Sequence, residues 1–185
     1  MEAHNPKKRS PAPWILGIGA LLAILSAIAG LRSGAPLATG LEGTAAPEFL
    51  LPRLDSAAAQ PKSGPAQSRG KPLLLHFWSP SCEPCVAELP TWQALAAQGR
   101  APGGDFTVLT VTAEEPADVR NFLTQRKIQL PTVLDADAAV HEAYHVAGIP
   151  HTVAISKTGV IVRELVRAHS AQELEQALDA ARNAP

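Results

Sequence analysis

Cysteine, methionine and aromatic residues are scarce in this sequence, and neither sign of charge predominates. Its 185 residues include 2 cysteines and 1 methionine, 4% are aromatic, and the formal net charge is −1. Binding to nucleic acid needs a clustered basic surface, which this balance does not provide, so we expect no nucleic-acid partner. There is also no second Cys-x-x-Cys and no matched Cys/His pair to complete a zinc site. A chain of this length has room for one ordinary domain and a tail.

What the sequence does contain is one long uncharged segment near its N-terminus. Residues 14–31 carry no charge and follow the basic cluster Lys7, Lys8 and Arg9. A helix of this length rises roughly 27 Å, close to the ~30 Å hydrocarbon core of a bilayer. The basic cluster predicts a cytoplasmic N-terminus with the rest of the chain outside. Ala27-Ile28-Ala29 resembles a small-residue cleavage site and leaves a cleaved signal peptide as the alternative. A buried helix of a soluble domain is disfavoured, because a helix apolar on every face needs a larger protein around it.

The expected organisation follows from this segment. We expect a cytoplasmic tail (1–13), a single transmembrane helix or signal segment (14–31), a linker (32–45) and one folded domain (46–185). Within the domain, residues 56–70 are rich in Ala, Ser, Gln, Pro and Gly and are expected to form an exposed loop. The predicted location is the cell membrane, crossed once, with the C-terminal domain on the extracytoplasmic (periplasmic) side.

The hydrophobic pattern of the domain alternates between strand and helix. Apolar and β-branched runs predict strands, and spacings of three and four residues predict helices. We expect, in chain order, a buried strand at 72–78, a helix over 82–98, a strand at 106–112, a helix from 116, a short helix over 138–144, a hairpin of 152–156 and 160–166, and a last helix starting at the capping box of Ser170 and Glu173. This order implies an α/β fold whose mixed sheet has helices on both faces.

The two cysteines are placed where a helix is expected to begin. Cys82 and Cys85 are three residues apart, directly after a predicted strand. At a helix N-terminus the unpaired N–H groups and the helix dipole favour the thiolate of Cys82, which is the form that attacks a disulfide. Cys85, one turn further along, can then displace the substrate from the mixed disulfide. A permanent staple is the alternative, but closing so short a loop stabilises little. The pair therefore predicts a redox-active disulfide.

Several short motifs together resemble one family. They are Phe77-Trp78, Cys82-Glu83-Pro84-Cys85, Glu88 with Pro90, the entry Ala46-Pro47-Glu48-Phe49, and the run from Asp135 through Tyr144 and Val146 to Gly148-Ile149-Pro150. This set resembles the thioredoxin superfamily, in particular its membrane-tethered TlpA/ResA/CcmG-like reductases, over about residues 46–181. The resemblance implies a thioredoxin-like fold, a central mixed β-sheet flanked by helices, behind the single N-terminal transmembrane helix.

The resemblance also implies roles for individual residues. Pro150 would be a cis-proline facing the cysteines, and Ile149 would present its backbone to a bound client, with Trp78 also in the substrate-binding region. Pro90 would kink the active-site helix. Glu88 matches a family glutamate that is thought to move protons near the cysteines, although an exposed helix carboxylate is the plainer interpretation.

Three positions depart from the family pattern. Ser81 stands where a tryptophan usually precedes the first cysteine, which would leave that cysteine more open. His76 stands where thioredoxins carry a buried acid, and as a neutral base it could accept the Cys85 proton; otherwise it is a packed strand histidine. His151 follows Pro150 where relatives carry threonine. Close to Cys82 it would stabilise the thiolate, and pointing away it is only a strand residue. His141 and His145 are expected to face solvent.

The resulting functional prediction is an extracytoplasmic thiol–disulfide oxidoreductase that needs no cofactor and no metal. It would take electrons from a membrane thiol donor and reduce an oxidised client, for which the resemblance suggests apocytochrome c or a copper-centre assembly protein. Two alternatives stay open. One is a thiol oxidase or isomerase, which His151 would favour. The other is a Cu(I)-binding assembly factor, against which the single methionine counts.

Overall fold

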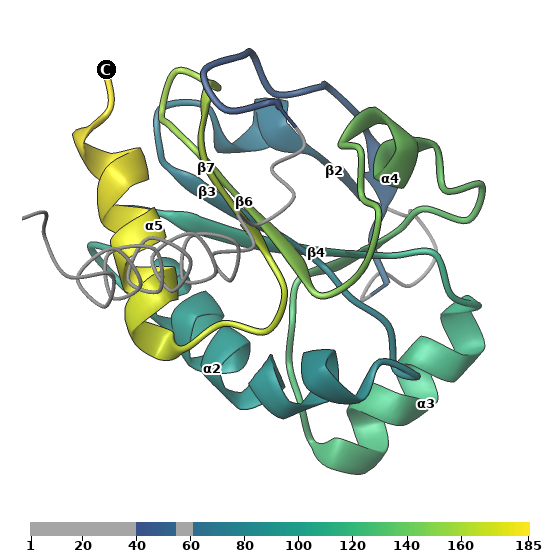
Figure 1. The fold of residues 1–185 in the computed structure, drawn as a ribbon. Helices are drawn as coiled ribbons and strands as arrows, with labels where there is room; N and C mark the ends of the chain where they lie inside the picture. The colour runs from purple at the N-terminus through teal and green to yellow at the C-terminus, as the bar shows by residue number, and fades with distance from the viewer. Residues whose placement is uncertain (1–39, 55–60) are drawn as a thin grey trace, which may run out of the picture. The chain divides into compact units, whose positions relative to one another are not determined.

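The computed structural model of the protein describes residues 40–54 and 61–185 (Figure 1). The tail at 1–13 and the predicted transmembrane segment at 14–31 lie outside the described residues, as does most of the linker. Within the described part of the chain, no helix combines the length and the hydropathy needed to cross a bilayer. The location of the membrane anchor therefore stays a prediction from the sequence.

A five-stranded mixed sheet forms the centre of the domain. Its strands, in spatial order, are β5 (Thr132–Leu134), β4 (Thr107–Thr112), β3 (Leu73–Phe77), β6 (His151–Ile155) and β7 (Ile161–Val166). The β3–β4 and β4–β5 pairs are parallel, and the β3–β6 and β6–β7 pairs are antiparallel. A separate antiparallel pair is formed by β1 (Leu51–Pro52) and β2 (Lys62–Ser63). The central strand β3 is buried along its whole length, as its mostly apolar sequence predicts, and the buried residues include His76.

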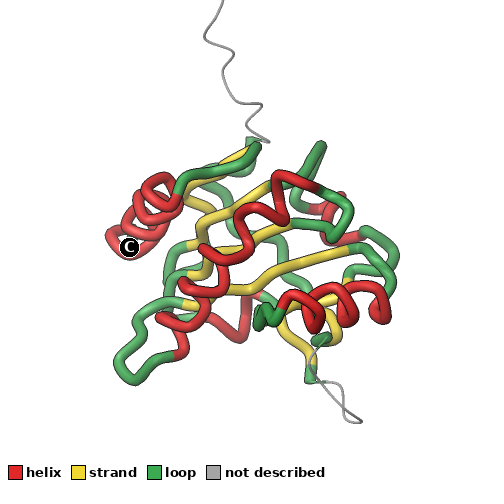
Figure 2. Tube along the Cα trace, turned by 90° about the horizontal axis from the view of Figure 1, so that it is seen from below, coloured by secondary structure: helices red, strands yellow, loops and turns green. Residues whose placement is uncertain are grey.

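Helices cover both faces of this sheet. The connecting helices are α2 (Glu83–Arg100), α3 (Pro116–Arg126), α4 (Ala139–Ala143) and α5 (Ala171–Asn183), with a short 3₁₀ turn, η1 (Pro65–Ser68). Parallel strands joined by right-handed crossovers place α2 and α3 on the same face, and Figures 1 and 2 show the larger helices gathered there, with α4 apart from them. This is the thioredoxin-like arrangement expected from the sequence.

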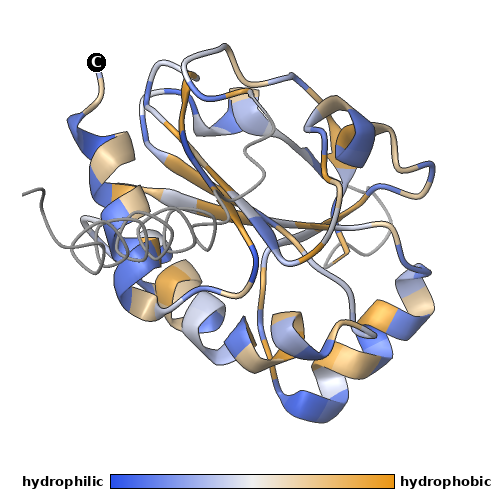
Figure 3. Cartoon of the chain, in the orientation of Figure 1, coloured by the Kyte–Doolittle hydropathy of each residue, from blue (hydrophilic) through white to orange (hydrophobic). Residues whose placement is uncertain are grey.

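Each face has its own apolar core, which follows from the alternation of side chains along β3. Leu74 and Trp78 pack with α2, α3 and α5, and we call this the α2 face. Leu73, Leu75 and Phe77 pack on the opposite side with Val140 and Tyr144, and we call this the α4 face. In Figure 3 the strands are largely apolar, while the helices carry both hydrophilic and apolar residues along their length. The face on which the side chain of a strand residue lies determines which other side chains it can contact.

Most of the predicted elements are present, with small shifts of their ends. Three short strands were missed: β1 and β2 have two residues each, and β5 has three and follows Pro131, so none of them carries a periodic pattern. The described part of the stretch expected to be an exposed loop, residues 61–70, has regular structure: Lys62–Ser63 forms β2, and Pro65 and Ser68 are buried in η1. The domain also begins before Ala46, because Gly43 N–H bonds to Ile161 O and Ala45 bridges to Val160.

Candidate active site

The cysteine pair lies at the N-terminus of α2, as predicted. Cys82 is the N-cap residue, and its Sγ accepts a hydrogen bond from Cys85 N at 3.2 Å. The two sulfurs form a disulfide. Cys85 is fully buried, whereas Cys82 is partly exposed. A client can therefore reach only Cys82 directly, which matches its expected role as the attacking cysteine, with Cys85 resolving.

The loop in front of Cys82 is held by serine side chains. Ser79 Oγ lies 2.7 Å from Ser81 Oγ and donates to Glu114 Oε1 at 2.5 Å. Ser79 is buried and Ser81 is exposed. The replacement of the usual tryptophan by Ser81 thus leaves a small polar side chain beside the accessible cysteine, as the sequence suggested.

The Ile149–Pro150 peptide bond is cis, in agreement with the expectation for Pro150. The register pairs His151 with Phe77 at the carboxyl end of β3. Because α2 follows that same end of β3, the cis-proline loop and the disulfide lie at one end of the sheet. Pro150 is buried and Ile149 is partly exposed. The carbonyl of Pro150 accepts a hydrogen bond from Arg167 N at 3.0 Å, which ties this loop to the end of β7.

Glu88 is buried instead of being an exposed helix carboxylate. It lies one turn after Cys85 on the same side of α2, with 7% of its surface exposed. Its Oε1 accepts from the backbone N–H of His169, and its Oε2 accepts from Trp92 Nε1 at 3.4 Å. The His169 ring is close too, with Nδ1 3.5 Å from Oε1. Glu88 is thus a buried carboxyl held by two N–H donors, one helical turn from Cys85.

His76 is fully buried on the α2 face. Its Nδ1 lies 3.0 Å from Thr152 Oγ1, and its ring stacks on that of Trp92 with centroids 4.2 Å apart. Burial lowers the pKa of His76 well below its ordinary value of 6.5, and the nearby His169 and His151 lower it further. The ring is therefore neutral at physiological pH, and taking up a proton there is disfavoured.

The ring of His151 would have to lie beside Cys82 to stabilise its thiolate, but it lies on the opposite face of the sheet. Directly paired residues of antiparallel strands share a face, so His151 is on the α4 face with Phe77, their ring centroids 5.9 Å apart. Burial lowers its pKa, which Glu164 partly opposes. The expectation that the imidazole sits beside Cys82 is thus wrong, because strand alternation turns it away. The other interpretation, a strand residue pointing away, matches the structure.

Two more sequence expectations are corrected by burial. Trp78 is only 1% exposed and packs against Phe122, so it cannot contact a client from the surface of this conformation. His141 is not solvent-facing: its Nδ1 lies 2.6 Å from Asp135 Oδ2, and its ring meets the ring of Phe77 edge-on. His145 is exposed, as expected. In both corrected cases the tertiary fold brings a partner to the side chain: Phe122 to Trp78, and Asp135 to His141.

The residue that sequence reasoning missed is His169. It lies in the loop before α5, far along the chain from the cysteines and outside any recognised motif, and its side chain is 1% exposed. No spacing rule connects it with Glu88, because only the fold brings residues 81 positions apart into contact. A lone histidine in a loop gives no signal of this kind.

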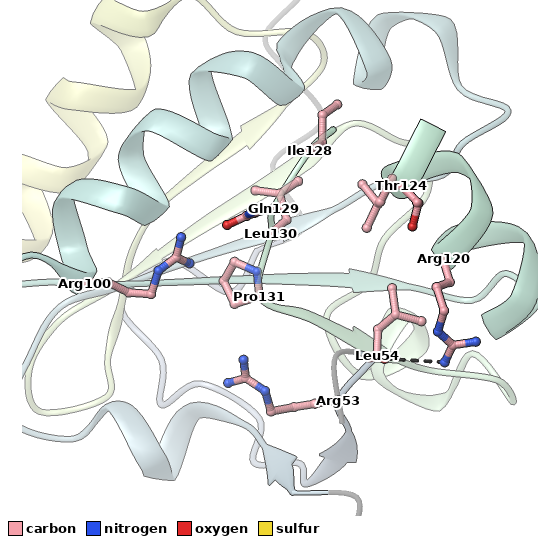
Figure 4. Close-up of a pocket in the computed structure, with 10 residues that line it drawn as sticks. Arg53, Leu54, Arg100, Arg120, Thr124, Ile128, Gln129, Leu130 and Pro131 are labelled. Atoms are coloured by element: carbon pink, nitrogen blue, oxygen red, sulfur yellow. Dashed lines mark hydrogen bonds between the residues drawn. The ribbon is translucent and has the colours of Figure 1, made fainter. Parts of the chain in front are cut away.

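The site offers no obvious place for a metal ion. Among residues 40–54 and 61–185, no group of three or more His, Cys, Asp or Glu side chains is arranged to hold one. A cavity of about 750 Å³ lies elsewhere, beside β5 (Figure 4). Arg53, Arg100 and Arg120 surround an apolar floor there, and none of its lining residues belongs to the disulfide site.

Fold and site together define a class of protein. A thioredoxin-like sheet, a disulfide capping a helix and a cis-proline at the same end of the sheet are the features of a thiol–disulfide oxidoreductase. The AhpC/TSA family matches residues 43–164, and the chain belongs to this family.

Named relatives and solved structures agree with this class. The chain is 27% identical to "Thiol-disulfide oxidoreductase ResA" of a Bacillus cereus strain over 133 residues, 72% of this chain and 74% of that one. It is 30% identical to ResA of Bacillus subtilis (strain 168) over 122 residues, 66% of this chain and 65% of that one. Among structures, the exposed lipoprotein thioredoxin Etrx1 of Streptococcus pneumoniae strain TIGR4 superposes with a TM-score of 0.63 at 26% identity, covering 72% of this chain and 98% of that one.

Proposed function

We propose that this protein is an extracytoplasmic reductase that transfers electrons to disulfides of client proteins. The observation that carries the proposal is the arrangement of an accessible Cys82, a buried Cys85 and a buried Glu88 one turn below it. Placement outside the cytoplasm rests on the uncharged run at 14–31 and the basic residues before it. In that compartment a dithiol needs a dedicated electron source, for which we propose a membrane thiol donor.

The reaction proceeds by two thiol–disulfide exchanges. The Cys82 thiolate attacks one sulfur of the client disulfide, which forms a mixed disulfide and releases the other client sulfur as a thiolate. Cys85 then loses its proton and attacks Cys82 Sγ, which breaks the mixed disulfide and releases the second client thiolate. The client gains two electrons and two protons, and the enzyme is left with the Cys82–Cys85 disulfide. The membrane donor returns two electrons and two protons to restore the thiols.

Glu88 is the preferred acceptor for the Cys85 proton in this scheme. Glu88 and Cys85 are neighbours on one side of α2. Among the described residues, no other carboxylate is buried together with these two. His76 is the weaker candidate, since burial and two neighbouring histidines hold its pKa well below the ordinary value. A base that resists protonation takes up a proton poorly at neutral pH.

We assign client recognition to the main chain of the cis-proline loop, at the end of the sheet where the disulfide lies. Ile149 is partly exposed and precedes Pro150 at the disulfide end of the sheet, so an extended client segment can pair with its main chain. Such binding selects little by side chain, which suits clients that share an unfolded, disulfide-bonded segment. Apocytochrome c before haem attachment and a copper-centre assembly protein are the client types we propose.

The reduction potential of the Cys82–Cys85 couple tests the direction of transfer. We expect a strongly reducing value, near or below the about −270 mV of thioredoxin. A value near the about −120 mV of the oxidant DsbA would overturn the reductase proposal. Tight Cu(I) binding by the reduced protein without disulfide exchange would replace it with the copper-binding alternative.

A trapping variant identifies the client. With Cys85→Ser the mixed disulfide on Cys82 cannot be resolved, so covalent complexes should accumulate in extracts of the extracytoplasmic compartment. The matched control, Cys82→Ser, keeps the buried cysteine but lacks the accessible one, and should trap nothing. Equal trapping by both variants would contradict the assignment of Cys82 as the attacking residue.

A further inference from the structure

The loop between β7 and α5 contacts both sides of the redox site. Arg167 has a φ of 138°, a backbone region that residues other than glycine rarely adopt, and its N–H donates to Pro150 O at 3.0 Å. Two residues later, the N–H of His169 donates to Glu88 Oε1. One short loop therefore holds the cis-proline segment on one side and the active-site carboxyl on the other.

The side chain of His169 is buried against the same carboxyl. It is 1% exposed, and its Nδ1 lies 3.5 Å from Glu88 Oε1 without the alignment of a hydrogen bond. Burying an imidazole without good hydrogen bonds costs free energy, and an apolar residue of similar size would avoid that cost. Among the described residues, Glu88 is the acidic group that this ring contacts, so the ring is placed to act on that carboxyl.

We propose that His169 is a positioning residue for Glu88, holding its carboxyl beside Cys85 while the same loop fixes Pro150. The proposal rests on the proposed function only in using Glu88 as the acceptor of the Cys85 proton. The backbone N–H of His169 and the indole N–H of Trp92 engage the two carboxyl oxygens. The imidazole packs beside the first of them and limits the rotation of the carboxyl away from Cys85.

Other titratable groups surround this contact and would share any effect of pH. His76 from β3 and His151 from β6 both interact electrostatically with His169. The charged neighbours of His169 on the loop and on α5, Arg167 and Glu173, pair with each other at 2.9 Å on the surface. A test must therefore separate an effect passed through Glu88 from a general change of charge.

The attack by Cys85 can be measured directly with a small aromatic disulfide, dithiobis(nitrobenzoate), and the full chain. Cys82 of the reduced protein attacks first, releases one thionitrobenzoate and keeps the other as a mixed disulfide. Cys85 then passes its proton to Glu88 and its sulfur attacks Cys82, which breaks the mixed disulfide and releases the second thionitrobenzoate. The second kinetic phase, followed against pH, reports the step that Glu88 serves and does not depend on the natural client or on the direction of physiological transfer.

We expect His169→Leu to slow the second phase about tenfold and to displace its pH midpoint, because a misplaced acceptor weakens proton transfer. His169→Gln, whose amide can still reach Glu88, should restore most of the rate. In a Glu88→Gln background, His169→Leu should add no further change, since both act through one carboxyl. The control His141→Gln breaks a buried pair on the α4 face, so it should lower stability and leave the pH profile alone.

Two outcomes would overturn the proposal. One is a His169→Leu variant that unfolds more easily but keeps the second-phase pH profile, which is what a purely structural histidine predicts. The other is an equal slowing by His169→Leu with and without Glu88. An oxidising potential for the Cys82–Cys85 couple would refute the reductase proposal while leaving the coupling between His169 and Glu88 intact, so the two failures are distinguishable.

Discussion

At the scale of single residues, the histidines show how much burial changes what a side chain can do. His76 and His151 carry the same group on strands that pair with each other, yet their rings lie on opposite faces of the sheet. Burial lowers the pKa of both. Neither is suited to give or take a proton at neutral pH, which leaves Glu88 as the titratable group best placed beside Cys85.

This assignment predicts that replacing Glu88 affects the attack of Cys85 more than replacing His76 does. Glu88→Gln should slow the attack of Cys85 on the mixed disulfide by about 10²-fold and flatten its pH dependence, because general-base catalysis contributes on this scale. His76→Gln should alter the pH dependence much less, because its ring is already neutral there. The two variants are compared in the same second-phase assay. A larger effect of His76→Gln than of Glu88→Gln would reverse the assignment.

At the scale of elements, local signals were strong where a segment carries its own chemistry. The capping box predicted from Ser170 and Glu173 is present: Glu173 N donates to Ser170 Oγ at 3.2 Å, and Ser170 N donates to Glu173 Oε2 at 2.9 Å. The hydrogen bonds that Ser170 N and Ser170 Oγ donate to the carboxylate lower the pKa of Glu173. Helix α2 likewise begins at its cysteine cap, and it continues through Pro90 without ending.

The cap has a measurable contribution to stability. Ser170→Ala removes the acceptor for Glu173 N, so we expect a loss of about 1 kcal/mol in the free energy of unfolding, measured with urea. Ser170→Asp keeps an acceptor and should lose much less. Because Ser170 follows His169, the same variants also check that fraying of α5 alone leaves the second-phase pH profile unchanged. Equal stability of Ser170→Ala and the parent protein would contradict the cap.

At the scale of the whole molecule, the buried histidines make stability depend on pH. The folded protein keeps His76 and His151 neutral below pH 6.5, whereas the unfolded chain takes up protons there. The unfolded state then binds more protons, so stability falls as the pH is lowered from about 6.5 towards the folded pKa values. The slope approaches about 1.4 kcal/mol per pH unit for each histidine.

Urea unfolding between neutral and mildly acidic pH measures this slope. The variants His76→Gln and His151→Gln should each reduce it, even if they also lower stability at neutral pH. The carboxyl groups of Asp105 and Glu173, whose pKa values are lowered by Arg182 and by Ser170 respectively, lose their contribution only at more acidic pH. Increasing stability on acidification through the histidine range would show that the rings are protonated in the folded state.

Features that lie in continuous segments could be predicted from the sequence alone. The Cys-x-x-Cys pair at a helix start, the apolar central strand, the hairpin and the cap of α5 are encoded by neighbouring residues, because spacing along the chain sets helix and strand geometry. The predicted anchor at 14–31 is of the same kind, although it lies outside the described residues. The short strand β5 was missed because three residues carry no period.

Which of these residues meet depends on the folded arrangement of the strands and helices. The register of β6 against β3 turned His151 away from the cysteines, and packing on the α2 face buried Trp78 and Glu88. The contact of His169 with Glu88 joins residues 81 positions apart. Such contacts depend on how strands pair and on which face each side chain emerges, and a shift of one residue in register would turn each strand side chain to the opposite face. That is why the cysteines could be found from the sequence, whereas the contact of His169 with Glu88 could not.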